Sequence, residues 1–232
     1  KLMAPFARVI TVTFEESLKD YGKKAVWTGN PTRGKITPLN KGGFPPQAER
    51  GIFKNNGEKM PVILIIGGGT GAMAINELVW KSLDELTKFC RIIHITGKGK
   101  NNTPLRKGGE GGYISFEFLN IDQMAEAYAA ADIVISRAGM GVLTELSYLG
   151  KPAILIPMPN SHQEENARIF EEKEAAVVLD QKNLTPALFV ENIKMLIDNK
   201  ELRNNLSGNI GEVIKKGANK KIAEIIHGIL EM

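Results

Sequence analysis

Short apolar runs alternate with amphipathic segments from Val62 to the end of the chain. The predicted strands are Val62–Ile66, Arg91–Thr96, Tyr113–Leu119, Asp132–Ser136, Pro152–Pro157 and Ala176–Leu179. Helical periodicity marks Ala72–Thr87, Asp122–Ala131, Gly141–Leu149 and His162–Ala175; two further helices follow Thr185-Pro186, the last over Asn219–Leu230. Near-continuous apolar strands are typical of burial on both faces, so the pattern predicts an α/β fold with a doubly wound parallel sheet. A ligand is then expected outside the carboxyl ends of the strands.

The first sixty residues follow a different pattern. Val9–Phe14 and Ala25–Thr28 are predicted to be strands, and Arg33–Met60 is rich in Gly, Pro and Asn, which is typical of a linker. We expect residues 1–30 to end one domain, residues 31–60 to be a linker, and residues 61–232 to form a domain with C-terminal helices. The abrupt opening of the chain suggests that most of the first domain is missing.

Composition adds a few limits. The chain has 232 residues and a net charge of +4, an excess that suits an anionic small ligand or an anionic membrane surface and that also occurs in ordinary folded domains. Its single cysteine, Cys90, cannot form an internal disulfide, which favours a reducing compartment. The sequence shows no signal peptide, and no apolar run approaches the roughly 20 residues of a spanning helix.

The segment "VILIIGGGTGAMAINE" joins a strand to a helix through a glycine-rich turn. Bare backbone N–H groups and a helix N-terminus favour anions, phosphate above all. Gly67, Gly69 and Ala72 also match the G-x-G-x-x-A dinucleotide fingerprint, but the next strand ends in "HITGKGK" without the carboxylate that NAD requires. No Gly-Lys-Ser/Thr follows, which argues against a P-loop. The alternative is a turn that only packs the helix on the sheet.

A second candidate element is "SRAGMGVLTELSYLG". It places Glu145 in the early part of a helix that follows a strand and the turn Arg137–Gly141. An ionised carboxylate only accepts hydrogen bonds and can take two from the vicinal diol of a ribose. The alternative is that Glu145 simply complements the helix dipole.

The third element is "PMPNSHQEENA", in which His162, Gln163 and Asn166 open a helix. Such neutral donor–acceptor groups suit sugar hydroxyls, although helix capping also explains them. Arg33 in "TGNPTR" offers a guanidinium that matches phosphate oxygens. The sequence has no Asp-x-Asp and no His/Cys cluster with metal-ligand spacing, so we expect helix dipoles and basic side chains to neutralise a diphosphate, with no metal and no cofactor.

Four segments in order now carry a family resemblance: "TGNPTR", "GGGTGAMAINE", "EFLNIDQMAEAYAAADIVISRAGMGVLTEL" and "GKPAILIPMPNSHQEENA". Together they resemble the MurG family of peptidoglycan UDP-N-acetylglucosamine transferases. The resemblance implies the Rossmann-like C-terminal domain of a glycosyltransferase-B fold, with a remnant of the N-terminal domain. It implies an inverting transfer of GlcNAc from UDP-GlcNAc to a lipid-linked muramyl-peptide acceptor. It also implies a bacterial cytoplasmic enzyme, peripheral on the cytoplasmic face of the plasma membrane, with no nucleic-acid partner.

The resemblance further implies that acceptor and catalytic base belong to the N-terminal domain. We therefore expect no catalytic residue in this fragment, which should bind donor without turnover. The implied donor-binding residues are Arg33 at the diphosphate, Gly68, Gly69 and Thr70 in the glycine turn, Ile121 or Leu119 at uracil, Gly139, Met140, Gly141, Val142, Leu143 and Thr144 bordering the nucleotide, Glu145 at the ribose, and Gln163 with His162 and Asn166 at the sugar.

One departure from the family pattern concerns the glycine turn. The family commonly has Gly-Gly-Ser-Gln-Gly-Ala-Arg, whereas Gly69 replaces the Ser here and Thr70 the Gln. The identity of the donor sugar therefore stays open. The alternatives are a UDP-sugar transferase with another lipid acceptor, such as a diacylglycerol, and a non-catalytic nucleotide-binding module.

Overall fold

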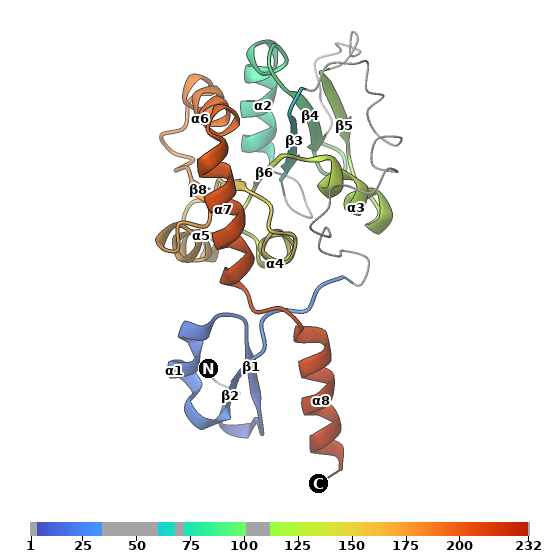
Figure 1. The fold of residues 1–232 in the computed structure, drawn as a ribbon, viewed down its shortest axis with the longest axis vertical. Helices are drawn as coiled ribbons and strands as arrows, with labels where there is room; N and C mark the ends of the chain where they lie inside the picture. The colour runs from blue at the N-terminus through green and yellow to red at the C-terminus, as the bar shows by residue number, and fades with distance from the viewer. Residues whose placement is uncertain (1–3, 34–59, 68–71, 101–111, 232) are drawn as a thin grey trace.

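The computed structural model describes residues 4–33, 60–67, 72–100 and 112–231 (Figure 1). Its main feature is a six-stranded sheet in the order β5-β4-β3-β6-β7-β8, in which every neighbouring pair is parallel. The strands are β3 (Val62–Ile66), β4 (Arg91–Ile95), β5 (Tyr113–Phe116), β6 (Ile133–Ser136), β7 (Ala153–Leu155) and β8 (Val177–Val178). The predicted parallel α/β sheet is confirmed.

Helices cover both faces of this sheet. They are α2 (Met73–Leu86), α3 (Ile121–Ala130), α4 (Met140–Leu149), α5 (His162–Glu172), α6 (Pro186–Asp198) and α7 (Lys200–Val213). Alternate residues of β3 enter opposite cores: Ile63 and Ile65 join the core under α2 and α6, while Leu64 and Ile66 join the core under α3, α4 and α5. This alternation of side-chain direction is the reason that every residue of β3 is apolar.

The strand order places the topological switch point between β3 and β6. From β3 the chain proceeds through β4 to β5 in one direction, and from β6 through β7 to β8 in the other. The two helices that leave these central strands at their carboxyl ends are α2 and α4. A crevice at such a point is where open parallel sheets bind ligands.

A small unit lies beyond one end of the large domain. It contains β1 (Ile10–Val12) and β2 (Ala25–Trp27), which pair in parallel, and the short helix α1 (Leu18–Tyr21). Phe14 packs edge-on against Phe170 of α5, with ring centroids 6.5 Å apart. The last helix, α8 (Ala218–Leu230), extends from the large domain toward the same end as the small unit (Figure 1).

Two segments run between the large domain and the small unit with α8: the "TGNPTR" segment, and the connection between α7 and α8. These two segments contact each other. Gly29 has φ +79°, and a Cβ there would come within 1.9 Å of the Lys215 carbonyl oxygen, so only glycine fits. The Thr32 backbone N–H donates to Asn219 Oδ1 at 3.0 Å, and Asn219 Nδ2 donates back to the Thr32 carbonyl at 3.1 Å. The "TGNPTR" segment is thereby tied to the start of α8.

Several element boundaries differ from the prediction. β5 stops at Phe116, three residues before the predicted end, because the chain leaves the edge of the sheet there and Asn120 caps α3. Helix α5 stops at Glu172 because Glu174 adopts a left-handed conformation with φ 49°. β1 is shorter than predicted, and α1 lies in a stretch where no helix was predicted. Most of the predicted linker, residues 34–59, lies outside the described residues.

Two further observations concern membranes and metals. Among the described residues, none of the helices combines the length and apolar character that spanning a bilayer requires. The same residues contain no group of three or more His, Cys, Asp or Glu side chains placed to hold a metal ion.

Candidate functional site

Glu145 is the centre of the most connected group of predicted site residues. It lies in the second turn of α4 and is 5% exposed. Arg33 Nε donates to Glu145 Oε1 at 2.6 Å, and the Arg33 Nη2 atom forms an ion pair with the same oxygen. The structure thus joins two residues that stand 112 positions apart in the chain.

The other carboxylate oxygen of Glu145 binds a residue that the sequence analysis did not select. Tyr128 of α3 donates its hydroxyl hydrogen to Glu145 Oε2 at 2.8 Å. Burial raises the pKa of Tyr128 well above its usual value, and the neighbouring Glu145 carboxylate raises it further. The tyrosine therefore remains a hydrogen-bond donor. The available signal was a single aromatic residue in the Ala-rich segment "AEAYAAA".

The N-termini of α2 and α4 differ from those of their neighbours. Asn120 caps α3 with its side chain, and Ser161 caps α5 by accepting from the Gln163 N–H. The N-cap residues of α2 and α4 are Ala72 and Gly139, and neither makes a side-chain cap hydrogen bond. First-turn N–H groups of a helix have no intrahelical acceptor and carry partial positive charge. Both uncapped termini belong to the helices that follow β3 and β6, at the switch point.

The first turns of α4 are also held from outside. Thr144 Oγ1 donates to the Met140 carbonyl at 2.7 Å and accepts from Asn30 Nδ2 at 2.8 Å. Asn30 precedes Arg33 in the same segment, so "TGNPTR" meets α4 at two points. Of the other predicted residues here, Gly141 is exposed, Gly139, Met140 and Val142 are half-buried, and Leu143 is fully buried. Leu143 can therefore offer a ligand only its backbone.

The start of α5 lies beside the turn that precedes α4. Asn166 Nδ2 donates to the Ala138 carbonyl at 3.0 Å, which links the two segments. Gln163 Oε1 accepts from the Met158 N–H at 2.9 Å, while no partner of its Nε2 atom occurs in the described part of the chain. His162 is exposed. These predicted sugar contacts are thus close to the α4 terminus.

A buried guanidinium strengthens the same edge of the sheet. Arg137 follows β6 directly, is 7% exposed, and donates through Nη1 to the Ile156 carbonyl at 3.0 Å. Burial lowers its pKa. The bond ties the end of β6 to the end of β7, from which α4 and α5 depart, and the sequence analysis did not select this residue.

The remaining predicted residues divide into three groups. Leu119 is 2% exposed and belongs to the core with Tyr128 and Met124, so its side chain offers no surface to a ligand. Ile121, the first residue of α3, is half-buried. Gly68, Gly69 and Thr70 lie outside the described residues.

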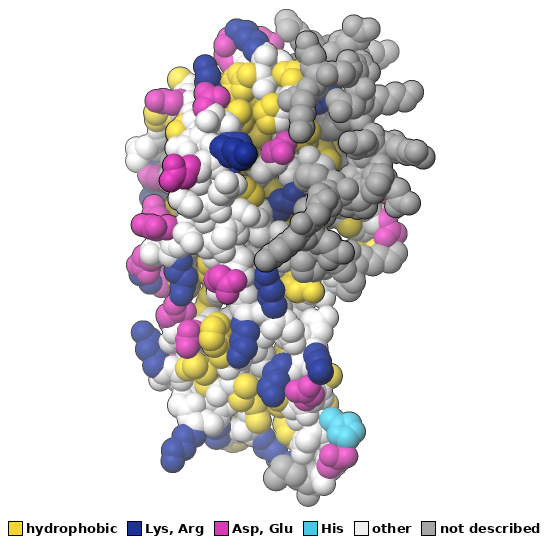
Figure 2. Space-filling model, in the orientation of Figure 1, with side chains coloured by type: hydrophobic (Ala, Val, Ile, Leu, Met, Phe, Trp, Pro, Cys, Tyr) yellow, Lys and Arg dark blue, Asp and Glu magenta, His cyan; other side chains and the backbone are white. Residues whose placement is uncertain are grey.

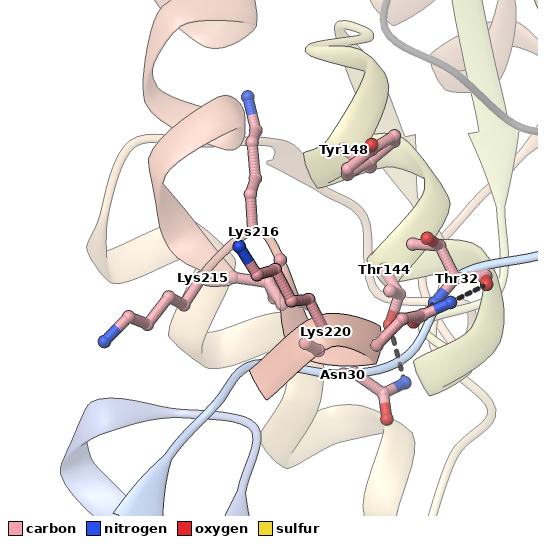
Figure 3. Close-up of a pocket in the computed structure, with 11 residues that line it drawn as sticks. Asn30, Thr32, Thr144, Tyr148, Lys215, Lys216 and Lys220 are labelled. Atoms are coloured by element: carbon pink, nitrogen blue, oxygen red, sulfur yellow. Dashed lines mark hydrogen bonds between the residues drawn. The ribbon is translucent and has the colours of Figure 1, made fainter. Parts of the chain in front are cut away.

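A cavity of about 230 Å³ lies beside α4 (Figure 3). Thr144 and Tyr148, one turn apart on α4, form one wall, and Asn30 and Thr32 form another. The connection between α7 and α8 supplies Lys215 and Lys216, and the first turn of α8 supplies Lys220. Lys215 turns away and lies over the Trp27 ring at 4.8 Å. Lys and Arg side chains also gather around this junction on the surface in Figure 2. The cavity borders a neighbouring face of α4 and not the one that meets Tyr128.

Known proteins are similar to this chain in sequence and in fold. The chain is 34% identical over 246 residues to a Thermoanaerobacter protein named UDP-N-acetylglucosamine–N-acetylmuramyl-(pentapeptide) pyrophosphoryl-undecaprenol N-acetylglucosamine transferase, which covers 99% of this chain and 64% of that protein. Proteins of the same name from Clostridium botulinum and Clostridium kluyveri are 37% and 39% identical, over 93% and 84% of this chain and 62% and 54% of their own lengths. The chain therefore spans less than two thirds of these relatives.

Solved structures agree on the fold. The Acinetobacter baumannii MurG structure has a TM-score of 0.70 at 22% identity, covering 98% of this chain and 62% of the other. A kitacinnamycin glycosyltransferase has a TM-score of 0.71 at 20% identity, covering 96% and 55%. The expected Rossmann-like fold is therefore confirmed. The sequence pattern of the glycosyltransferase family 28 C-terminal domain matches residues 62–224. The chain thus belongs to glycosyltransferase family 28, and residues 62–224 are its C-terminal domain.

Proposed function

We propose that this chain is the donor-binding part of a transferase that moves N-acetylglucosamine from UDP-GlcNAc to a lipid-linked muramyl-peptide acceptor. The single observation that carries the proposal is the pair of uncapped helix termini, α2 and α4, at the switch point of the sheet, with Arg33 and Glu145 beside the second. The names of the relatives supply the donor and acceptor.

In this proposal the diphosphate lies at the switch point. The N–H groups in the first turns of α2 and α4 are donors already aimed at an anion, and they cost no reorganisation when charge develops on the leaving diphosphate. A preorganised donor of this kind is commonly worth about 3 kcal/mol in the transition state. Inversion at the anomeric carbon requires the acceptor oxygen to attack as the diphosphate leaves.

Glu145 is proposed to accept the ribose hydroxyls. Its oxygens now take two contacts from Arg33 and one from Tyr128, and a carboxylate can accept about four hydrogen bonds, so the diol needs the positions that Arg33 vacates when it turns away. The Arg33 side chain is 47% exposed and can turn from the carboxylate toward a phosphate, a ligand its guanidinium fork also matches. Arg33 and Glu145 thereby hold each other in place until the nucleotide binds, with its phosphate at Arg33 and its ribose at Glu145.

The uracil base and the donor sugar are assigned to residues on either side of Glu145. We assign the uracil contact to Ile121 because its side chain is partly exposed at the start of α3, whereas Leu119 is buried. Gln163 Nε2 has no partner among the described residues and is assigned to a sugar hydroxyl, while Oε1 accepts from the Met158 N–H. We place acceptor binding, the general base and peripheral contact with the cytoplasmic face of the membrane on the part of the enzyme outside these 232 residues.

Calorimetric titration tests the proposal. UDP and UDP-GlcNAc should bind this chain, and NADH should not. UDP-galactose binding tighter than UDP-GlcNAc would assign the domain to another UDP-sugar transferase. Binding of NADH without binding of UDP would overturn the proposal in favour of a dinucleotide-binding module.

A further inference from the structure

A chain of hydrogen-bonded side chains runs through the core between α2, β4 and β5. The Trp80 indole N–H donates to the Tyr113 hydroxyl oxygen at 3.3 Å, and this oxygen lies 3.0 Å from His94 Nδ1. His94 Nε2 lies 3.0 Å from Asn76 Oδ1, and Asn76 Nδ2 donates to the Thr96 carbonyl at 2.9 Å. Asn76, His94 and Thr96 are 0% exposed.

The two ends of this chain determine the direction of every bond within it. The Thr96 carbonyl can only accept, so the amide nitrogen of Asn76 must face it and the amide oxygen must face His94. The hydrogen of His94 is then on Nε2, and Nδ1 accepts from the Tyr113 hydroxyl. The Trp80 indole N–H can only donate, and a lone pair of the Tyr113 hydroxyl oxygen accepts its hydrogen bond.

The chain is complete only while the imidazole is neutral. Burial lowers the pKa of His94 to about 4, so a single tautomer with one donor and one acceptor persists at neutral pH. A histidine that carries no charge at neutral pH, and that water cannot reach, does not act as an acid or base toward a ligand. Its role must come from the groups that it holds in place.

The group held in place is the first turn of α2. Asn76 is the fourth residue of this helix, and its side chain fixes the turn to Thr96, the residue that directly follows β4. The same turn has no N-cap hydrogen bond from a side chain and lies at the switch point of the sheet. A small rotation of α2 would redirect its first N–H groups, and the buried amide of Asn76 resists that rotation.

We infer that Asn76 and His94 are positioning residues that aim the N-terminus of α2 at the diphosphate of the nucleotide. This inference rests on the proposed function. Neither residue touches the nucleotide, so both act through the helix. Disruption should therefore weaken binding of ligands that carry the diphosphate and spare the nucleoside.

The test compares Asn76→Ala with a matched control on the same helix. Ser82→Ala is that control, because Ser82 is 1% exposed and, among the residues that the structure describes, its hydroxyl bonds only to the Leu78 carbonyl within α2. Calorimetry should show that Asn76→Ala weakens UDP binding about tenfold and uridine binding less than twofold, since a misdirected helix terminus loses roughly this much interaction with a charged group. Ser82→Ala should change neither affinity.

Tyr113→Phe provides a second variant that keeps the aromatic packing and removes both hydrogen bonds of the Tyr113 hydroxyl, the one to His94 and the one from Trp80. Nitrogen-15 spectra should show His94 with hydrogen on Nε2 in the wild type and in Tyr113→Phe, because Asn76 Oδ1 still accepts it. Calorimetry should show a two- to threefold loss in UDP affinity in this variant. Hydrogen on Nδ1 in the wild type, or equal losses for UDP and uridine in the variants, would overturn the positioning role. Failure of the wild-type chain to bind UDP would instead overturn the proposed function.

Discussion

Tyr128 on α3 donates its hydroxyl hydrogen to Glu145 Oε2 on α4 over 2.8 Å, and the two side chains are 1% and 5% exposed. Because a buried carboxylate oxygen without a donor is costly, this bond stabilises the Glu145 side chain inside the protein. It also fixes the second oxygen while Arg33 occupies the first. The carboxylate is thus oriented before any ligand binds.

Tyr128→Phe tests this orientation. The variant should lower the free energy of unfolding by about 1.5–3 kcal/mol, since it removes a hydrogen bond to a charged group and leaves Glu145 Oε2 unpaired. Urea unfolding measures the loss. Tyr148→Phe on α4 is the control, because the Tyr148 hydroxyl makes no hydrogen bond within the described residues; equal losses in the two variants would show that the Tyr128 bond contributes nothing specific.

Glu145→Ala tests the ribose contact when combined with a modified ligand. Wild type should bind 2′-deoxy-UDP more weakly than UDP by about 1–3 kcal/mol, because a hydrogen bond to a charged acceptor is lost. Glu145→Ala should bind the two ligands with equal affinity, as calorimetry can establish. A variant that still prefers UDP would place the 2′-hydroxyl on another residue.

Arg33→Ala tests the diphosphate contact. Affinity for UDP should fall by about 2 kcal/mol, near thirtyfold, and affinity for uridine should not change, because uridine lacks the diphosphate that the guanidinium is proposed to bind. Arg168→Ala is a matched control, since Arg168 forms exposed ion pairs with Glu165 and Glu172 on the outer face of α5. Loss of uridine affinity in Arg33→Ala would mean that Arg33 acts by supporting Glu145.

Acid should destabilise the protein through His94. The folded-state pKa of about 4 lies below the unfolded value of 6.5, so the unfolded chain binds a proton that the folded chain does not. Stability from this group is full above pH 6.5, falls as the pH drops from 6.5 to about 4, and is constant below. Wild type should therefore lose roughly 3 kcal/mol more than His94→Phe between pH 7 and pH 4 in urea unfolding. Parallel pH profiles of the two proteins would contradict this.

The fold could be predicted because apolar periodicity and capping residues act locally. β3 has the predicted bounds Val62–Ile66, and a helix follows Thr185-Pro186 as predicted, because Thr185 caps α6 and Pro186 is its first residue. The helix α4 ends at Leu149, as predicted, and Gly150 follows it in a left-handed conformation. These features depend on residues a few positions apart, which a sequence shows directly.

The side-chain hydrogen bonds within the site could not be predicted from such local patterns. Glu145 was selected for its chemistry, but its bonds to Tyr128 and Arg33 join three separate segments and depend on how α3 and α4 pack. Arg137 likewise needs the neighbouring strand before its carbonyl partner can be named. The choice between Leu119 and Ile121 required burial, which changes over two positions where a strand ends and a helix begins.

The central claim is that the carboxyl edge between β3 and β6 binds the nucleotide of a UDP-sugar. A crystal structure of this chain with UDP tests it most directly. The account predicts ribose hydroxyls within hydrogen-bonding distance of Glu145 and phosphates between the N-termini of α2 and α4, with Arg33 turned toward them. UDP bound at another surface, or this edge empty at saturating UDP, would contradict it.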